Sequence, residues 1–238
     1  MSKVRLYVDH PLGAGQTILL ERDQAHYLFG VMRLGAGAVL SLFNGRDGEW
    51  DADVTEAAKR RGRLTCVRQT RALQEPPDLW LLFAPIKKAR TDFIVEKATE
   101  MGARRICPVL SDFTNSERVR VDRLQAHAVE AAEQCGGTFL PEVAAPVKLG
   151  RLLEDWDSAR ALMFCDETRL GAAVALPDAL RAPAAILIGP EGGFSPRERD
   201  RLQAMDCATG VSLGPRILRA DTAAVAALTL WQSALGDW

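Results

Sequence analysis

The sequence has few of the features from which disulfide-rich and metal-binding proteins are built. Its five cysteines, an odd number in a chain of 238 residues, are scattered and include no C-x-x-C pair. We therefore expect reduced and mostly buried thiols. The three histidines do not cluster with the cysteines at the spacing of metal ligands, so we expect no metal site.

Long apolar runs are also absent. No stretch approaches about eighteen consecutive apolar residues, and the charged start of the chain is not followed by an apolar run of signal-peptide length. We therefore expect a cytoplasmic protein with no membrane partner. Hydrophobic residues make up 47% of the chain and charged residues 26%, which is typical of a globular protein with one large or two small domains.

The net charge of −1 argues against a nonspecific nucleic-acid coat protein, but the charges are unevenly distributed. One segment without acidic residues holds Lys59, Arg60, Arg61, Arg63, Arg68 and Arg71. This segment predicts a basic surface that contacts RNA phosphates. A solvated face without a partner is the alternative.

The first 72 residues read as short strands between Gly and Asp turns. We expect strands at 5–8, 17–20, 39–43, 49–54 and 63–67. A helix over 24–34 is expected to be capped by Asp23 and to bury Tyr27 in its apolar face. The pattern predicts a small β-barrel over residues 1–72. Two prolines within 73–78 forbid both a helix and a central strand, so we place the domain boundary there.

From residue 73 to residue 238, apolar strands alternate with helices. We expect strands at 79–84, 105–110, 161–165, 184–188 and 210–213, and helices at 88–101, 121–135, from 196 and at 222–235. Apolar strands between helices are typical of a parallel sheet that is covered on both faces. The predicted fold class is therefore α/β, with a small N-terminal barrel and a C-terminal domain built on a mostly parallel sheet.

Two strand-turn-helix units between residues 184 and 228 predict a ligand site. The strand 184–188 leads into the glycine-rich turn 189–194, and Ser195 with Glu198 predicts a capping box for a helix that begins at Pro196. The strand 210–213 leads into a second glycine turn, after which Asp221 is placed to cap a helix. Ligands of open α/β sheets bind beside such turns. Two tight turns without a ligand are the alternative.

The first turn lacks the motifs of two common ligand classes, which narrows the choice of ligand for this site. Residues 189–193 carry no P-loop lysine and do not fit G-x-G-x-x-G, which disfavours a nucleoside triphosphate or a dinucleotide. Glycines let the backbone approach a flat ligand closely, so that peptide groups can read an adenine edge.

Six segments of the chain resemble the motifs of the RsmE family. They are 187–195 and 213–223, together with 26–34, 42–45, 97–102 and 130–135. Its members are bacterial 16S rRNA uridine-N3 methyltransferases of the knotted SPOUT superfamily. The resemblance implies an RNA-binding PUA-like barrel, a trefoil knot threaded near 213–221 and a homodimer. It also implies methylation of N3 of uridine 1498, in the usual rRNA numbering, within the small ribosomal subunit. Asp221 and Gly137 stand where the family has Glu and often Arg.

The resemblance implies S-adenosylmethionine (SAM) as the methyl donor. The donor-binding residues that it implies are Ile188, Gly189, Pro190, Glu191, Gly192, Gly193, Leu213, Gly214, Ile217, Leu218, Thr222 and Ala223. The candidate RNA-binding residues are Arg33, Lys59, Arg60, Arg61, Arg63, Lys88, Arg118 and Arg120.

The chemistry of N3 methylation selects the catalytic candidates. N3 of uridine carries a proton at neutral pH and must lose it before or during attack on the sulfonium methyl group, which calls for a base and for positive charge. We expect Arg219 to stabilise the uracil oxyanion, while Asp221 or Glu191 accepts the proton or orients a water. Arg219 as a ligand of loop carbonyls, and Asp221 as a helix cap alone, are the alternatives. A cysteine nucleophile is not needed for methylation at nitrogen.

Two other functions fit the same sequence. One is a non-catalytic RNA-binding factor of ribosome assembly, and the other is a methyltransferase of a different RNA. Measuring the binding of the methyl donor distinguishes an assembly factor from an enzyme. Identifying the modified nucleoside distinguishes a methyltransferase of a different RNA.

Overall fold

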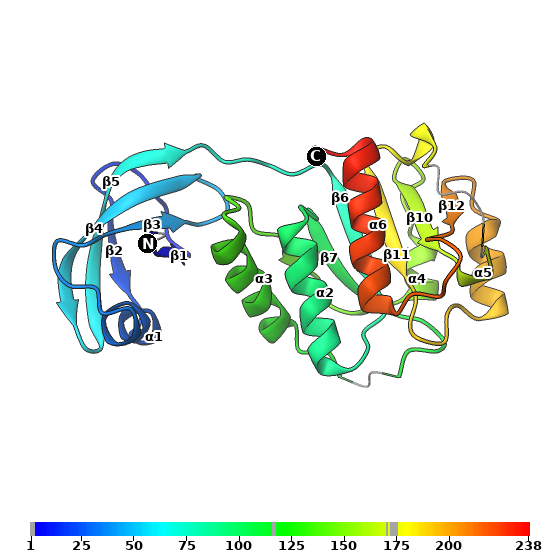
Figure 1. Cartoon of the computed structure of the whole chain (residues 1–238), viewed down its shortest axis with the longest axis horizontal. Coiled ribbons are helices and arrows are strands. Elements are labelled where there is room, and N and C mark those ends of the chain that lie inside the picture. Colours follow the sequence, from blue (N-terminus) through cyan, green and yellow to red (C-terminus); the bar gives the residue numbers. More distant parts are fainter. Residues whose placement is uncertain (1–2, 116–117, 170, 172–175) are drawn as a thin grey trace. The chain divides into compact units, whose positions relative to one another are not determined.

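The computed structural model describes residues 3–115, 118–169, 171 and 176–238. The chain divides into two compact units, one comprising Met1–Glu75 with Ala132–Leu140 and the other Pro76–Ala131 with Pro141–Trp238. Figure 1 shows the strands of the first unit in blue and cyan and those of the second unit from cyan to orange. Each unit is described by its own sheet and core.

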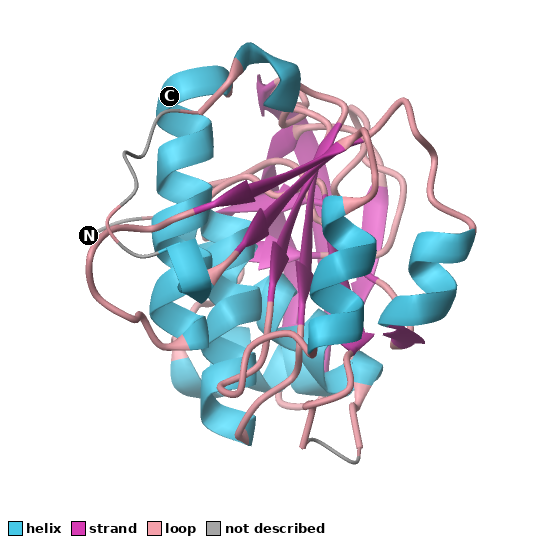
Figure 2. Cartoon of the chain, turned by 90° about the vertical axis from the view of Figure 1, so that its right-hand side faces the viewer, coloured by secondary structure: helices cyan, strands magenta, loops and turns pink. Residues whose placement is uncertain are grey.

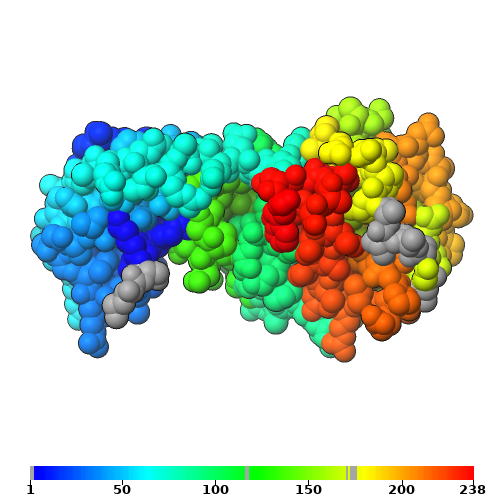
Figure 3. Space-filling model, turned by 45° about the horizontal axis from the view of Figure 1, so that its top comes forward, coloured from blue at the N-terminus to red at the C-terminus, as the bar shows by residue number. Residues whose placement is uncertain are grey.

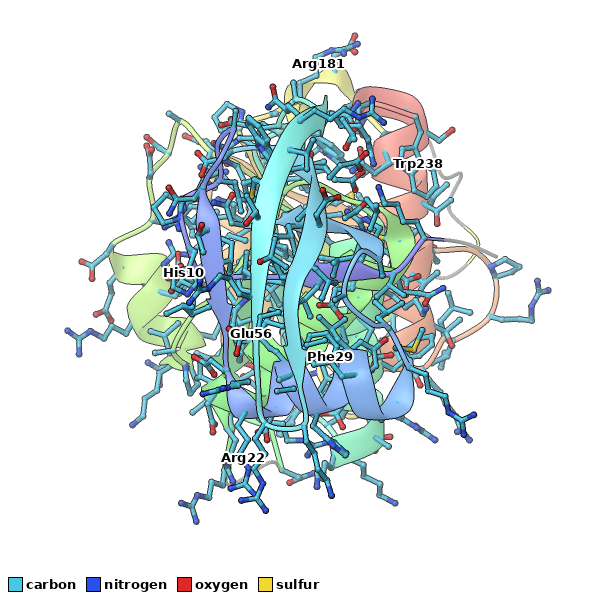
Figure 4. The ribbon with its side chains drawn as sticks, turned by 90° about the vertical axis from the view of Figure 1, so that its left-hand side faces the viewer. His10, Arg22, Phe29, Glu56, Arg181 and Trp238 are labelled. Atoms are coloured by element: carbon cyan, nitrogen blue, oxygen red, sulfur yellow. The ribbon has the colours of Figure 1, made fainter. Side chains whose placement is uncertain are left out.

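The first unit contains a five-stranded sheet in the order β1-β3-β4-β5-β2. The strands are β1 (Arg5–Tyr7), β2 (Thr17–Leu20), β3 (Val39–Phe43), β4 (Glu49–Ala58) and β5 (Arg61–Arg71). Only the β1–β3 pair is parallel among these strands. Ile18, Leu40 and Leu64 are fully buried in its core. The predicted strands are confirmed, and β4 and β5 extend beyond them into the long hairpin seen in Figure 4.

The cap predicted for the helix of this unit is wrong. The helix α1 (Arg22–Ala25) begins after Glu21, which forms a capping box with Gln24, so that Asp23 lies within the first turn. A carboxylate in the first turn still favours the positive end of a helix.

The predicted periodicity of this helix is also wrong. After α1 the chain continues as the π-helix η1 (His26–Val31), whose hydrogen bonds join residues five apart. The buried face therefore shifts: Leu28 is fully buried, whereas Tyr27 is 39% exposed and Val31 is 59% exposed. The expectation that Tyr27 belongs to the core is corrected accordingly.

A segment distant in sequence completes the first unit. The guanidinium of Arg5 donates hydrogen bonds to the carbonyls of Ala132, Glu133 and Gly137 at 2.7 to 2.8 Å. The carbonyl of Gly137 is thus used in holding this segment against β1.

The second unit is built on a seven-stranded sheet in the order β12-β10-β11-β6-β7-β8, with β9 paired to β7. All of these pairs are parallel, as predicted. The strands are β6 (Leu79–Phe83), β7 (Arg105–Leu110), β8 (Glu142–Val143), β9 (Val147–Lys148), β10 (Ala161–Cys165), β11 (Ala184–Ile188) and β12 (Ala208–Val211). The helices are α2 (Lys88–Glu100), α3 (Val121–Cys135), α4 (Leu149–Glu154), α5 (Pro196–Gln203) and α6 (Ala220–Leu235), with short 3-10 turns η2 (Glu167–Arg169) and η3 (Asp178–Leu180).

Helices cover both faces of this sheet, as Figure 2 shows. On one face, Leu82 and Leu187 of the sheet cluster with Leu153 of α4 and Leu202 of α5. On the other face, α6 packs on β11 and against α2. Trp231 of α6 is fully buried there and donates a hydrogen bond of 2.7 Å to the carbonyl of Leu180. This hydrogen bond ties α6 to the segment that precedes β11.

The helix that follows the first glycine turn begins as predicted. Ser195 Oγ accepts a hydrogen bond from the N–H of Glu198, and the Glu198 carboxylate accepts one from the N–H of Ser195. This capping box starts α5 at Pro196.

The helix after the second turn begins earlier than predicted. Arg219 is the residue before α6, which starts at Ala220, so Asp221 lies in the first turn and is not the cap. Asp221 Oδ1 accepts the neighbouring N–H of Thr222, at 2.9 Å. The predicted cap is wrong because the chain turns helical before it reaches the carboxylate.

All five cysteines are free. Cys66 and Cys107 are buried, Cys165 and Cys207 are partly buried and only Cys135 is exposed, so the expected burial is complete for two thiols and partial for two more. No helix in the described part of the chain is both long and apolar enough to cross a membrane. Within the same residues there is no group of three His, Cys, Asp or Glu side chains that could hold a metal ion.

Candidate active site

The carboxyl ends of β12, β10, β11 and β6 meet at one edge of the sheet, because these strands are parallel and adjacent. A pocket of about 430 Å³ lies at this edge. Its size is that of a small-molecule site. The lining residues are Lys87, Arg90, Cys165, Asp166, Glu167, Ile188, Gly189, Pro190, Glu191, Gly193, Val211, Ser212, Leu213, Gly214, Arg216, Ile217, Leu218, Arg219, Ala220 and Ala223.

The turn after β11 forms one wall of this pocket. A Cβ at Gly189 would lie 3.1 Å from the ring of Phe194, and Gly193 has a φ of +68°. The left-handed backbone favours glycine at 193, and at 189 a larger residue would require the Phe194 ring to shift slightly. Glu191 extends from the same turn with a side chain that is 55% exposed. Gly192, also predicted at the site, does not line the pocket.

The segment between β12 and α6 forms the opposite wall. Gly214 adopts a φ of +113°, and its N–H donates to Ser212 Oγ at 3.2 Å. This turn carries Leu213, Ile217 and Leu218 to the pocket, as the sequence motif suggested. Figure 3 shows the segment in orange beside α6, whose colour deepens to red toward the C-terminus. Ala223 of α6 lines the pocket, whereas Thr222 does not.

A third wall comes from the end of β10, which the sequence reasoning missed. Asp166 is buried, and its Oδ1 accepts hydrogen bonds from the N–H and hydroxyl of Thr168. Its Oδ2 has no hydrogen-bond partner among the described residues, although Arg199 Nε lies 3.6 Å from Oδ1. An unpartnered buried carboxylate oxygen at a pocket wall fits a ligand that brings a hydroxyl group. The signal in the sequence was an apolar strand followed directly by two acids.

The rim of the pocket is basic. Lys87, Arg216 and Arg219 are exposed, and their side chains have no partner among the described residues. Arg90 differs, because it pairs with Glu191 and with Asp221. Asp221 does not line the pocket itself but reaches its rim through this pair. Three cations thus remain available to an anionic substrate.

Cys165 lines the pocket without being a nucleophile. Burial raises the pKa of its thiol to about 12, so the thiolate is negligible at neutral pH. This position therefore contributes apolar surface to the wall.

A smaller basic pocket of about 250 Å³ lies beside the first turn of α2. It brings together three of the predicted RNA-binding residues, Lys88, Arg118 and Arg120. Arg123 also lines it, but its guanidinium forms an ion pair with the buried Asp92. Arg120 pairs with the exposed Asp122 at 2.5 Å, where solvent weakens the interaction.

The basic segment of the first unit forms the turn of the β4–β5 hairpin and the strand after it. Lys59 and Arg60 occupy the turn, and Arg63 lies on the exposed side of β5. Their side chains have no partner within the described residues. Arg61, in contrast, pairs with Glu56 at 3.0 Å.

The remaining basic residues of this unit are placed differently. Arg68 pairs with Asp51, and Arg71 donates to the carbonyl of Gly136, so neither is fully free for a partner. Arg33 adopts a left-handed φ of 57° just after η1. Non-glycine residues with an unfavourable backbone conformation of this kind cluster at functional sites.

The sequence also matches two family models. The model described as an RNA methyltransferase domain matches residues 74–232, and the model of an RNA methyltransferase PUA domain matches residues 20–65. The ribosomal RNA small subunit methyltransferase E of Synechocystis is 33% identical over 219 residues, which cover 89% of this chain and 71% of that relative.

Two solved structures superpose on the whole chain. A methyltransferase from Legionella pneumophila in complex with its cofactor SAM has a TM-score of 0.91 at 27% identity, with 100% of both chains covered. The ribosomal RNA small subunit methyltransferase E from Neisseria gonorrhoeae, bound to S-adenosyl methionine, has a TM-score of 0.89 at 26% identity, again with 100% of both chains covered. The predicted fold class, a PUA-like domain followed by an α/β domain with a parallel sheet, is thereby confirmed. The chain belongs to the RNA methyltransferase family and, within it, to the ribosomal RNA small subunit methyltransferases E.

Proposed function

We propose that this protein transfers a methyl group from SAM to N3 of a uridine of 16S rRNA, at position 1498 of the usual numbering. The observation that carries the proposal is the pocket at the carboxyl ends of four parallel strands, with Arg219, which has no partner among the described residues, on its rim. Ligands of α/β sheets bind at this edge. The Synechocystis and Neisseria gonorrhoeae relatives are described as methyltransferases of small-subunit rRNA, and the Legionella pneumophila and Neisseria gonorrhoeae structures as bound to SAM.

The pocket suits a donor with a flat base and a hydroxylated sugar. The residues that would hold it are Ile188, Gly189, Pro190, Gly193, Leu213, Gly214, Ile217, Leu218 and Ala223. Asp166 adds a carboxylate oxygen without a partner among the described residues, which a ribose hydroxyl would satisfy. When bound, SAM supplies an electrophilic methyl group on a sulfonium. Gly192 and Thr222, which lie next to lining residues, support the walls rather than touch the donor.

Attack by N3 requires a cation and a base, and the rim of the pocket supplies both. Arg219 stabilises the negative charge that develops on the uracil oxygens as the N3–H bond breaks. Asp221 or Glu191 accepts that proton, directly or through a water. The electron pair left on N3 would then bond the methyl carbon as the methyl–sulfur bond of the donor breaks, with the electrons of that bond staying on the sulfur, which would leave as a neutral thioether. None of these reaction steps needs a thiolate, which agrees with the raised pKa of Cys165.

Two basic surfaces would hold the RNA backbone. The first unit offers Lys59, Arg60, Arg61 and Arg63 on the β4–β5 hairpin, together with Arg33. The second unit offers the pocket lined by Lys88, Arg118 and Arg120. Contacts to phosphates position an RNA without reading its sequence, so these residues set affinity and register.

We assign the RNA-binding role to residues 1–72 and methyl transfer to residues 73–238. We also infer that the enzyme is a cytoplasmic homodimer, and that the segment 213–221 threads a trefoil knot. Membership of the family supports these assignments. Sedimentation of the purified protein tests the dimer, and a mass consistent with one chain contradicts it.

Methyl transfer is tested by deleting the gene and measuring the nucleosides of 16S rRNA by mass spectrometry. We expect N3-methyluridine to disappear and to return when purified protein and SAM are added to small subunits from the deletion strain. If the nucleoside persists in the deletion strain, the assigned substrate is wrong. Calorimetry with SAM separates an enzyme from an assembly factor, because a factor without methyl transfer need not bind the donor.

A further inference from the structure

Arg90 occupies a position on the pocket rim that its place in the sequence did not reveal. It lies in the first turn of α2 and lines the pocket. Its Nη1 donates to Oε1 of Glu191 at 3.0 Å, and its Nε lies 3.6 Å from Oδ2 of Asp221. One guanidinium therefore joins the start of α2 to the turn after β11 and to the start of α6.

The exposures of the three side chains indicate what this link does. Arg90 is 30% exposed and Asp221 is 20% exposed, whereas Glu191 is 55% exposed. Glu191 stands on a glycine-rich turn, and a long side chain there would sample several rotamers in solvent. The planar guanidinium presents donors in fixed directions, which lets one arginine orient two carboxylates at once.

Arg90 and Arg219 are both cations of the pocket rim, but they differ in their partners. Arg219 is exposed and has no partner among the described residues, so it is free to meet a substrate. Arg90 is directed at the two carboxylates. The two acids selected from the sequence as bases are thus held by a single cation that is not itself directed at the substrate.

We propose that Arg90 is a positioning residue for methyl transfer, which holds Glu191 and Asp221 where one of them receives the N3 proton of the uridine. This proposal rests on the proposed function and adds to it the residue through which the base is aligned. Small displacements of a reacting group lower rates steeply, so the loss of Arg90 should appear mainly in the rate of transfer.

The first test compares Arg90→Ala and Arg90→Lys under single-turnover conditions, with small subunits from the deletion strain as substrate. We expect Arg90→Ala to lower the transfer rate by about tenfold or more, with the Kd for SAM changed by less than about threefold. Arg90→Lys keeps the charge but can pair with only one carboxylate, so it should recover part of the rate. Melting temperatures identify any variant that fails to fold.

The second test asks whether Arg90 acts through the acids. Arg90→Ala is combined with Asp221→Asn and, separately, with Glu191→Gln. Residues that act as a unit have non-additive effects, so Arg90→Ala should cost less in at least one of these backgrounds than in the wild-type enzyme. If it costs the same factor in both backgrounds, the positioning role is overturned.

The same assay distinguishes failure of the proposed function from failure of the role proposed for Arg90. Absence of transfer by the wild-type protein contradicts the proposed function. Normal transfer by the wild type, with full activity in Arg90→Ala, overturns the role of Arg90 alone. Equal loss of SAM affinity and rate in Arg90→Ala likewise overturns it, because the residue would then be a donor-binding group.

Discussion

A Cβ atom at Gly193 would lie 1.9 Å from Oε1 of Glu167. The two residues belong to the turn after β11 and to the segment after β10, which form two walls of the pocket. Gly193 also has a φ of +68°, which side chains other than hydrogen disfavour. The Glu167 carboxylate is the end of a flexible side chain and can move, so glycine is favoured at this position mainly by its left-handed backbone.

Gly193→Ala should weaken donor binding. The left-handed backbone alone costs about 1 to 2 kcal/mol for a residue with a Cβ, and Glu167 must also move. We expect the Kd for SAM to rise by about tenfold or more, which corresponds to about 1.4 kcal/mol, measured by calorimetry. Gly35→Ala is the control, because nothing lies within 4 Å of a Cβ there. Unchanged affinity in Gly193→Ala would show that the two walls move apart freely.

Arg219→Ala should slow methyl transfer without weakening donor binding. Removing one group that stabilises a developing oxyanion lowers kcat by about 100-fold or more. Single-turnover rates and calorimetry measure the two effects separately. The control is Arg181→Ala, which removes an exposed arginine that pairs with Asp178 outside the pocket. Full transfer by Arg219→Ala contradicts its catalytic role.

Cys165→Ala should retain methyl transfer. Burial raises the pKa of this thiol to about 12, so no thiolate is available to attack a base. We expect a rate within about threefold of the wild type, because only apolar wall surface is lost. Inactivation of Cys165→Ala, together with wild-type affinity for SAM, would indicate covalent catalysis.

Arg63→Gln should reduce the salt dependence of RNA binding. This exposed arginine of β5 has no partner among the described residues, so its charge is available to a phosphate. Loss of one phosphate contact lowers the slope of log K against log salt by about 1. Arg68→Gln is the matched control, because Arg68 pairs with Asp51 at 3.0 Å. Equal slopes for Arg63→Gln and the wild type would place the RNA elsewhere.

Asp78→Asn should destabilise the protein at neutral pH more than at acidic pH. Hydrogen bonds from Arg160, at 2.8 and 3.1 Å, hold the pKa of Asp78 below its ordinary value. The folded pKa is therefore below the unfolded one, so the pair stabilises above the ordinary pKa and is lost as pH falls through the lowered value.

We expect a loss of about 1 kcal/mol at pH 7, because Asp78 is partly exposed and solvent screens the pair. Urea unfolding at pH 7 and at about pH 3 measures the difference. Asp178→Asn is the control, since that side chain is 84% exposed. An equal loss at both pH values would contradict an electrostatic origin.

Features that depend on neighbours in the chain were predictable. The capping box of Ser195 and Glu198, the apolar strands and the glycine turns follow from hydrogen bonds and periodicities within a few residues. The π-helix η1 after α1 was not, because its hydrogen bonds change the periodicity on which the pattern depends. Asp221 satisfied the composition of a helix cap, yet the helix begins before it.

From the residues alone, the family, most of the strands and helices, and the two glycine turns that form opposite walls of the pocket were predictable, whereas β8, β9 and α4 were not. The distant residues that join those turns could be identified only in the folded chain. Asp166 reaches the pocket because β10 lies beside β11 and β12, and Arg90 meets Glu191 across 101 positions of sequence. Such contacts depend on the pairing order of a parallel sheet, which local periodicity does not specify. The glycine turns 189–194 and 214–220 were thus predictable, but the charged groups that work with them were not.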